Sequence, residues 1–203
     1  TQIEYIQTDG VAYINTGLVA TTPKSSEIKL LMGGNTRCGI LSGYSIDGTS
    51  SRDSRNFALL KYKDKYVVFA HYYNYVGSDG LPSISYSVDN SKAFTVRTAL
   101  AKGSQSISVK QENSSSWVSV SKRNNNTVSS TYGLILFNGY HNGSLSIPAP
   151  SGTRVYYCKI YSDNSYTTLV RDYVPCIYNG EYGLWDKVTN SFYGNSASSG
   201  SFT

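Results

Sequence analysis

The last fifty residues of the 203-residue chain constrain its fold most strongly. Two runs rich in β-branched and aromatic residues, 154–161 and 168–174, flank a polar loop at 162–166. Such a pair of runs around a polar loop is typical of a β-hairpin with a longer turn. Two short aromatic segments follow at 183–186 and 192–193. We therefore predict that this end of the chain forms several neighbouring antiparallel strands.

The rest of the chain also consists of short strand-like runs. In residues 27–32 apolar side chains alternate with charged ones, as in a half-buried strand, and residues 66–75 are apolar on both faces, as in a central strand. The Asp9-Gly10 dipeptide between two apolar runs predicts a tight hairpin. No window of eleven or more residues has helical apolar spacing. We predict about fourteen strands in one all-β domain over residues 1–203, packed as a two-sheet antiparallel sandwich.

The composition favours a protein that works outside the cell. Charged residues make up 15% of the chain, against about 25% in an ordinary globular protein. Serine, threonine, asparagine and 19 tyrosines carry the polarity instead. The chain opens at Thr1 without a methionine or a signal-like segment, which indicates a processed or excised domain. We expect an extracellular, cell-surface or virion location.

The charge distribution argues against two classes of partner. The net charge is +5, and the basic residues are scattered apart from the clusters at 61–65 and 122–123. A nucleic-acid site needs a clustered basic stripe, so we expect no nucleic-acid partner. No run of about 18 apolar residues occurs, so we expect no membrane insertion.

The three cysteines do not suggest a disulfide framework or a zinc site. Cys38, Cys158 and Cys176 are too few and too far apart for either. If 154–161 and 168–174 pair around their loop, Cys158 lies opposite a residue near Asp172 rather than opposite Cys176. We predict free, mostly buried thiols.

Both ends of the chain carry a family resemblance. Residues 5–17 read Tyr-Ile-Gln-Thr-Asp-Gly-Val-Ala-Tyr-Ile-Asn-Thr-Gly. They resemble the opening of the laminin-G-like, concanavalin A-type jelly-roll domains of gut-bacterial surface proteins and phage structural proteins. The similarity resumes at 157–161 and 169–176 and ends with 183–186, Phe192-Tyr193, Asn195 and 200–202. The middle of the chain matches only as a run of strands. The resemblance implies a jelly roll with a recognition or adhesion role, and it implies no particular ligand.

The residues of the matching motifs are expected to be architectural. Paired strands from the two chain ends would bring the termini close together. Arg171 and Asp172 alternate across a strand, so they cannot serve one pocket, and we expect each to form a buried or rim ion pair. Trp185, between Leu184 and Asp186, is expected in the core rather than as a platform for a sugar.

The sequence does not predict an enzyme. Glycosidases of this fold need two carboxylates on one strand face. The four glutamates, Glu4, Glu27, Glu112 and Glu181, have no acidic partner two or four residues away. The two histidines, His71 and His141, stand without a Gly-x-Ser-x-Gly segment. We expect neither a hydrolase nor a serine-nucleophile site.

Calcium is the one cofactor that the sequence leaves open. Jelly-roll lectins often hold it with Asp, Asn and backbone oxygens. Asp47, Asp53, Asp163 and Asn164 lie in polar loops, but their density is below that of an EF-hand loop. The sequence therefore assigns no metal ligands.

The leading hypothesis is a non-catalytic, lectin-like module for carbohydrate binding or adhesion. Sugar sites combine aromatic faces with amides or carboxylates. The candidate ligand-binding residues are Trp117, Tyr72, Tyr73, Asn74, Tyr75, Asn138, His141 and Asn142. Alternation in 114–121 places Val118 and Val120 on one face and Trp117 on the other, toward solvent.

Two alternatives remain at this stage. The tyrosines of 72–75 also suit a sandwich core, and a single exposed tryptophan is not unusual. In that case the chain is a structural virion or surface-protein domain that contacts only proteins, through an exposed edge strand. A glycan ligand and a cell-surface protein are therefore both expected partners. A glycoside hydrolase is the second alternative.

Overall fold

The chain is built from strands in every region that the structure describes. This computed structural model describes residues 1–19, 22–43, 55–62, 66–73, 83–85, 89, 91–101, 103–123, 132–141 and 144–203. It describes only the backbone of 55–58, 60–62, 66–73, 83–85 and 141. All regular structure in these residues is β, and no helix among them is long and apolar enough to cross a membrane. The predicted all-β sandwich is confirmed.

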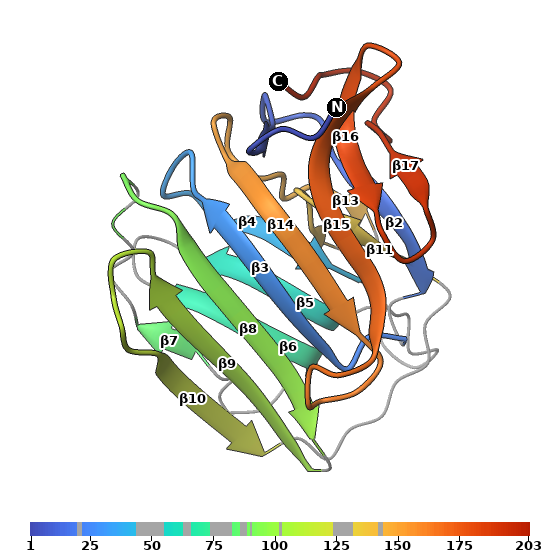
Figure 1. Cartoon of the computed structure of the whole chain (residues 1–203). Coiled ribbons are helices and arrows are strands. Elements are labelled where there is room, and N and C mark those ends of the chain that lie inside the picture. Colours follow the sequence, from blue (N-terminus) through green and yellow to red (C-terminus); the bar gives the residue numbers. More distant parts are fainter. Residues whose placement is uncertain are drawn as a thin grey trace.

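The larger sheet lies at the front of Figure 1. Its order is β10-β9-β8-β3-β14-β15-β16-β17, with β1 paired to β14, and all pairs are antiparallel. Its strands are β1 (Ile6–Gln7), β3 (Ser25–Leu31), β8 (Phe94–Ala101), β9 (Ser104–Gln111), β10 (Val118–Arg123), β14 (Arg154–Tyr161), β15 (Leu169–Tyr178), β16 (Glu181–Asp186) and β17 (Ser191–Tyr193). The predicted hairpin around 162–166 is β14–β15, in which Cys158 pairs with Tyr173.

The smaller sheet packs behind the larger one (Figure 1). Its order is β2-β11-β4-β5-β6-β7, and β12 and β13 form a separate ribbon. The strands are β2 (Ile14–Val19), β4 (Cys38–Ser42), β5 (Arg55–Tyr62), β6 (Tyr66–Tyr73), β7 (Ser83–Ser85), β11 (Gly133–Leu136), β12 (Tyr140–His141) and β13 (Ser144–Leu145). The long hairpin expected after residue 57 is β5–β6, closed by the pairing of Tyr62 with Tyr66.

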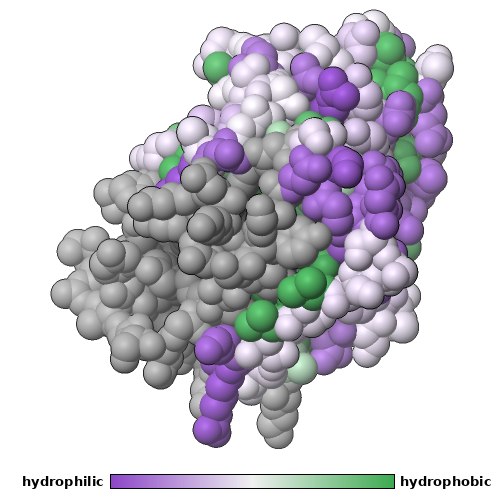
Figure 2. Space-filling model, turned by 90° about the vertical axis from the view of Figure 1, so that its left-hand side faces the viewer, coloured by the Kyte–Doolittle hydropathy of each residue, from purple (hydrophilic) through white to green (hydrophobic). Residues whose placement is uncertain are grey.

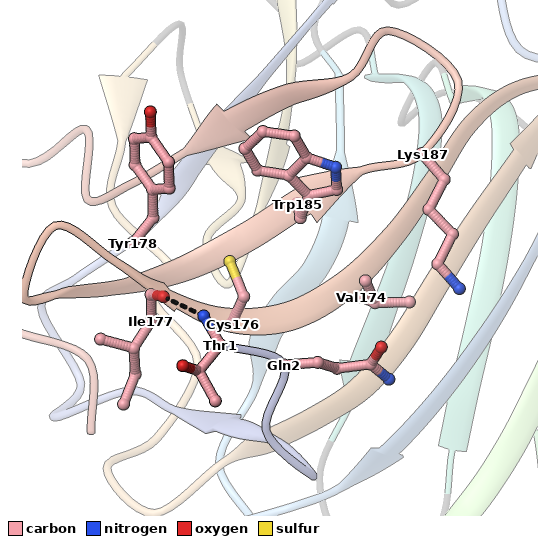
Figure 3. Close-up of a pocket in the computed structure, with 8 residues that line it drawn as sticks. All are labelled: Thr1, Gln2, Val174, Cys176, Ile177, Tyr178, Trp185 and Lys187. Atoms are coloured by element: carbon pink, nitrogen blue, oxygen red, sulfur yellow. Dashed lines mark hydrogen bonds between the residues drawn. The ribbon is translucent and has the colours of Figure 1, made fainter.

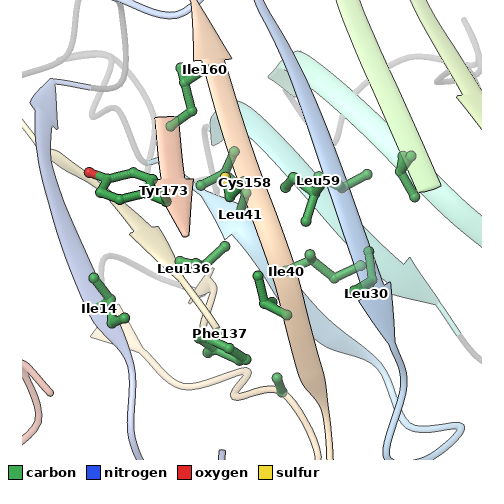
Figure 4. Packing of buried hydrophobic residues seen from close by; sticks show 14 of the residues in the cluster. Ile14, Leu30, Ile40, Leu41, Leu59, Leu136, Phe137, Cys158, Ile160 and Tyr173 are labelled. Carbon is green, nitrogen blue, oxygen red and sulfur yellow. The ribbon is translucent and has the colours of Figure 1, made fainter. Parts of the chain in front are cut away.

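The core lies between the two sheets and follows from strand alternation. One row of side chains crosses the larger sheet from β15 to β9, and every member is fully buried: Tyr173, Cys158, Ile28, Val96 and Val109. Side chains from the smaller sheet pack against them (Figure 4). Burial of each such aliphatic side chain contributes about 1.5–3 kcal/mol. All three cysteines are free and buried, as predicted.

The two chain ends interlock, and the predicted hairpin at Asp9-Gly10 is wrong. β1 pairs with β14 in the larger sheet, whereas β2 pairs with β11 in the smaller one. The Asp9 carboxylate accepts the N–H groups of Val11 and Ala12, which turns the chain from one sheet toward the other. The C-terminal segment takes the free side of β1, where Gln7 and Thr203 exchange two backbone hydrogen bonds. The termini are therefore close together, as predicted (Figure 1).

Candidate functional site

The motif residues Arg171 and Asp186 lie inside the sandwich. Arg171 Nε is 3.5 Å from a carboxylate oxygen of Asp186 and donates to the Thr16 carbonyl at 3.3 Å. The Tyr173 hydroxyl donates to the same carbonyl at 2.8 Å. These contacts join β15 of the larger sheet to β2 of the smaller one. The expected ion pair at Arg171 is confirmed.

The Asp186 carboxylate is saturated by protein donors. It is fully buried and accepts the backbone N–H groups of Asp172 and Val188 and the hydroxyl of Thr189. With the arginine as its counterion, this group organises the β16–β17 turn. Its role is architectural, as the sequence predicted for the motif residues.

Trp117 lies on the outer face of the larger sheet, just before β10. The Cζ carbon of Arg97 is 4.7 Å from the centroid of the indole, and Lys110 Nζ is 5.3 Å from it. Both cations come from positions that alternate with the buried Val96 and Val109 of β8 and β9. The indole is half-buried under these two side chains. The indole therefore makes cation–π contacts with two side chains.

The valines after Trp117 lie on the opposite side of β10. Val120 packs against the core, as alternation predicted, and Val118 pairs with Val109. Val118 nevertheless keeps 43% of its surface exposed. The reason is its place on β10, which ends the larger sheet and has no second neighbour in the described residues.

Arg97 is held on several sides. Its Nε donates to Glu27 at 2.5 Å, and the Tyr166 ring lies 5.5 Å from its Cζ. The Tyr157 hydroxyl donates to the other oxygen of Glu27 at 2.9 Å. Burial, helped by the carboxylate of Glu27, raises the pKa of Tyr157 to about 12, so the hydroxyl remains a donor.

The exposed charged groups around Trp117 are cationic. The Arg97 side chain is 43% exposed, and among the described residues its two Nη atoms make no hydrogen bond. Lys110 has no carboxylate within ion-pair distance among the same residues. We call Trp117, Arg97, Lys110, Glu27 and Tyr166 the Trp117 cluster. It presents fixed donors on the outer face that suit an anionic group.

The other predicted site residues do not join this cluster. Tyr72 and Tyr73 end β6 of the smaller sheet, and His141 ends β12, at positions where only the backbone is described. Asn138 is 6% exposed, and its side-chain oxygen accepts the N–H of Gly139. Predicted residues Asn74, Tyr75 and Asn142 lie outside the described residues.

A hollow opens at the other end of the same outer face (Figure 3). Trp185 is half-buried and stands on this face between the buried Leu184 and Asp186. The expectation that Trp185 belongs to the core is therefore wrong, because alternation within β16 sends its neighbours inward. The hollow has a volume of about 310 Å³ and is lined by Thr1, Gln2, Val174, Cys176, Ile177, Tyr178, Trp185 and Lys187. We call it the Trp185 hollow.

A glycine makes room for the aromatic wall of this hollow. A Cβ atom on Gly183 would lie 2.7 Å from the Phe192 ring and 2.5 Å from the backbone oxygen of Tyr193. Without that atom, the Phe192 ring lies across β16 and reaches Tyr178, at 5.4 Å between centroids. Tyr178 in turn stands 5.6 Å from Trp185. The sequence pattern did not predict this packing, because Phe192 and Tyr178 lie on the two strands that flank β16 and reach Gly183 only through strand pairing.

The N-terminal segment forms the opposite wall. Thr1 and Ile177 exchange two backbone hydrogen bonds of 2.8 Å, and Ile3 donates to the Pro175 carbonyl. This pairing places Gln2 beside Cys176 on β15. Gln2 reaches the hollow only through this long-range pairing, which no local sequence pattern indicates.

The calcium candidates remain without a site in the described residues. Asp163 accepts the N–H groups of Ser165, Thr167 and Thr168 and the hydroxyl of Thr167, so its oxygens already hold the turn. No group of three or more His, Cys, Asp or Glu side chains is placed to hold an ion in the part of the chain that the structure describes. Asp47 and Asp53 lie outside that part.

Comparison with known proteins reveals similarity at the level of structure. No family model and no curated protein sequence gives a significant match. The CBM40 of the Ruminococcus gnavus IT-sialidase, bound to α2,3-sialyllactose, has 13% identity and a TM-score of 0.56 over 81% of this chain and 92% of its own. Tailspike protein 2 of an Escherichia coli O157:H7 bacteriophage has 12% identity and a TM-score of 0.51 over 78% of this chain, which spans 23% of the tailspike.

These similarities establish the fold but not the function. At such low identity the matching structures share an architecture of two packed antiparallel sheets. The same architecture carries unrelated functions in different proteins. The resemblance at the two chain ends predicted this result: the chain has the concanavalin A-like jelly-roll fold.

Proposed function

We propose that this chain is a non-catalytic recognition module that binds an acidic glycan through the Trp117 cluster. The observation that carries the proposal is the Arg97 guanidinium, which two aromatic rings and Glu27 hold in place, while no described residue accepts a hydrogen bond from its Nη atoms. A planar guanidinium donates two parallel hydrogen bonds to a carboxylate or sulfate. Lys110 adds a second charge beside the same indole.

Preorganisation is the physical advantage of this arrangement. Glu27 and the two rings fix the arginine before any ligand arrives, so less side-chain entropy is lost on binding. The contacts with the indole contribute about 0.5–1 kcal/mol each at an exposed site. One solved structure with this fold contains a bound acidic glycan, α2,3-sialyllactose.

The test compares matched glycans and matched variants. An array should carry lactose, α2,3-sialyllactose, and sulfated and neutral polysaccharides. We expect retention of acidic glycans, and about tenfold or greater weakening by Lys110→Gln, because hydrogen bonds to charged groups contribute about 1.5–3 kcal/mol. Lys122→Gln is the control because it also removes one positive charge. Lys122 lies on β10, pairs with Gln105 and is on the same face of that strand as Val120, away from Trp117.

Two array results contradict the proposal. One is an array on which no glycan is retained, and the other is equal retention of lactose and its sialylated form. Equal weakening by the two lysine variants would mean that net charge, rather than the Trp117 cluster, attracts the ligand. A glycan ligand fits a module at a bacterial or phage surface, and hydrolysis of a bound glycan would show an enzyme instead.

A structural role through protein contacts is the second candidate. β10 ends the larger sheet, and five of its six residues are exposed. An edge strand of this kind offers backbone groups to another chain. On the described part of that side of the molecule, apolar residues form small separate areas rather than one patch (Figure 2). Self-association that Val120→Pro abolishes, together with an empty array, would favour this candidate.

A further inference from the structure

We propose that the Trp185 hollow is a second binding site and takes a single uncharged pyranose ring. The inference rests on the proposed function for its ligand class, because a module for glycans meets neutral sugar rings as well as acidic ones. It concerns a different site, at the opposite end of the larger sheet, and does not involve Trp117, Arg97 or Lys110.

The walls of the hollow match the apolar face of a sugar ring. The rings of Trp185 and Tyr178 are tilted by 45° and their centroids are 5.6 Å apart. Tyr178 keeps 47% of its surface exposed although it is aromatic. Its ring packs against Phe192, which fixes its position beside the hollow. Two fixed aromatic walls at an angle suit a rigid ring with C–H groups on one face.

The rim supplies the polar groups that sugar hydroxyls require. Gln2 and Lys187 line the hollow, and in Figure 3 the polar ends of both side chains lie on the side of Val174. The amide of Gln2 donates and accepts hydrogen bonds, and the ammonium of Lys187 donates up to three. Both groups are exposed and hydrated, and a sugar hydroxyl can replace their water with a direct hydrogen bond, whereas an apolar peptide side chain cannot. The rim therefore favours a sugar over an apolar side chain.

The size of the hollow limits the ligand to about one ring. A volume of about 310 Å³ lies at the lower limit of ligand pockets, which measure about 300–1,000 Å³. Val174 and the nearly buried Cys176 of β15 are among the residues that line it. A single carbohydrate residue, at a chain end or within a longer glycan, is the unit that fits.

The two sites are far enough apart to be observed separately. β10 and β16 are six strand spacings apart in the larger sheet, or about 29 Å at about 4.8 Å per spacing. The chain has two tryptophans, Trp117 and Trp185, one at each site. Each indole N–H gives one resonance in a nitrogen–proton correlation spectrum, and the variants Trp117→Phe and Trp185→Phe assign the two signals.

The experiment titrates the whole 203-residue chain with the methyl glycosides of glucose, galactose and N-acetylglucosamine. We expect at least one of them to shift the Trp185 signal and to leave the Trp117 signal in place. Tyr178→Ala should weaken this response about tenfold or more, because it removes one aromatic wall. Tyr182→Ala is the matched control: it removes an exposed tyrosine from β16 that does not line the hollow.

The outcomes separate this inference from the proposed function. If no methyl glycoside shifts the Trp185 signal, or if Tyr178→Ala and Tyr182→Ala weaken the response equally, the second site is refuted. In that case Lys110-dependent retention of acidic glycans would still uphold the proposed function. If Trp185 responds while acidic glycans are not retained, the second site stands and the assignment to the Trp117 cluster fails.

Discussion

Replacement of Asp186 by asparagine tests whether the motif residues hold the sandwich together. The carboxylate is fully buried and lies 3.5 Å from Arg171, whose side chain is 14% exposed. Asp186→Asn leaves that guanidinium without a counterion, and removal of one partner of a buried pair costs about 3–5 kcal/mol. Arg171 keeps the carbonyls of Thr16 and Val170 as acceptors, so we take the lower end, about 3 kcal/mol.

The magnitude converts directly into a melting temperature. For a chain of this size each kcal/mol shifts Tm by about 2–4 °C, so Asp186→Asn should lower Tm by about 6–12 °C. Thermal unfolding followed by circular dichroism measures the shift. Arg171→Met in the Asp186→Asn background should cost less than the same change in the wild type, because the pair is already broken. A drop under about 2 °C, or fully additive effects, would refute the architectural role.

Three further predictions concern separate parts of the molecule. Tyr173→Phe removes the hydroxyl bonded to Thr16, which keeps Arg171 as a donor, so urea unfolding should show a loss of only about 1 kcal/mol. Desolvation raises the pKa of Asp163, but hydrogen bonds from Thr167, Thr168 and Ser165 outweigh it and hold this pKa below 3.8. The stability that results from this shift is present above pH 3.8 and is lost as the pH falls below it. Asp163→Asn should therefore make Tm fall less steeply as the pH is lowered. Raising the salt concentration should weaken binding of acidic glycans but leave the Trp185 response to neutral glycosides unchanged.

Much of the fold could be predicted because it follows from local patterns. Period-2 alternation placed Ile28 and Leu30 in the core, and the polar loop at 162–166 fixed the pairing of β14 with β15. The failed hairpin at Asp9 had the right local signal. It failed because the C-terminal segment competes for the free side of β1 with two backbone hydrogen bonds to Gln7, and a pairing across the whole chain leaves no trace in the turn itself.

The candidate site was less predictable because its residues come from distant strands. Alternation placed Trp117 on the outer face, but the sequence did not reveal that Arg97 and Lys110 would cover its indole. Those contacts depend on the order β10-β9-β8, which brings three separate segments side by side. In the same way, Gln2 reaches the Trp185 hollow only because the first residues pair with β15.

The division between inner and outer faces explains how one strand can hold the sandwich and also expose a side chain at the surface. Within β16, Leu184 and Asp186 point inward and hold the sandwich, while Trp185 between them points outward. The register of a strand sets both of its faces at once, because a slip of one residue moves every inward side chain outward and every outward side chain inward. The buried pair of Asp186 with Arg171 therefore also fixes where Trp185 stands. By this reasoning exposed positions of the outer face can be substituted while the scaffold beneath stays the same.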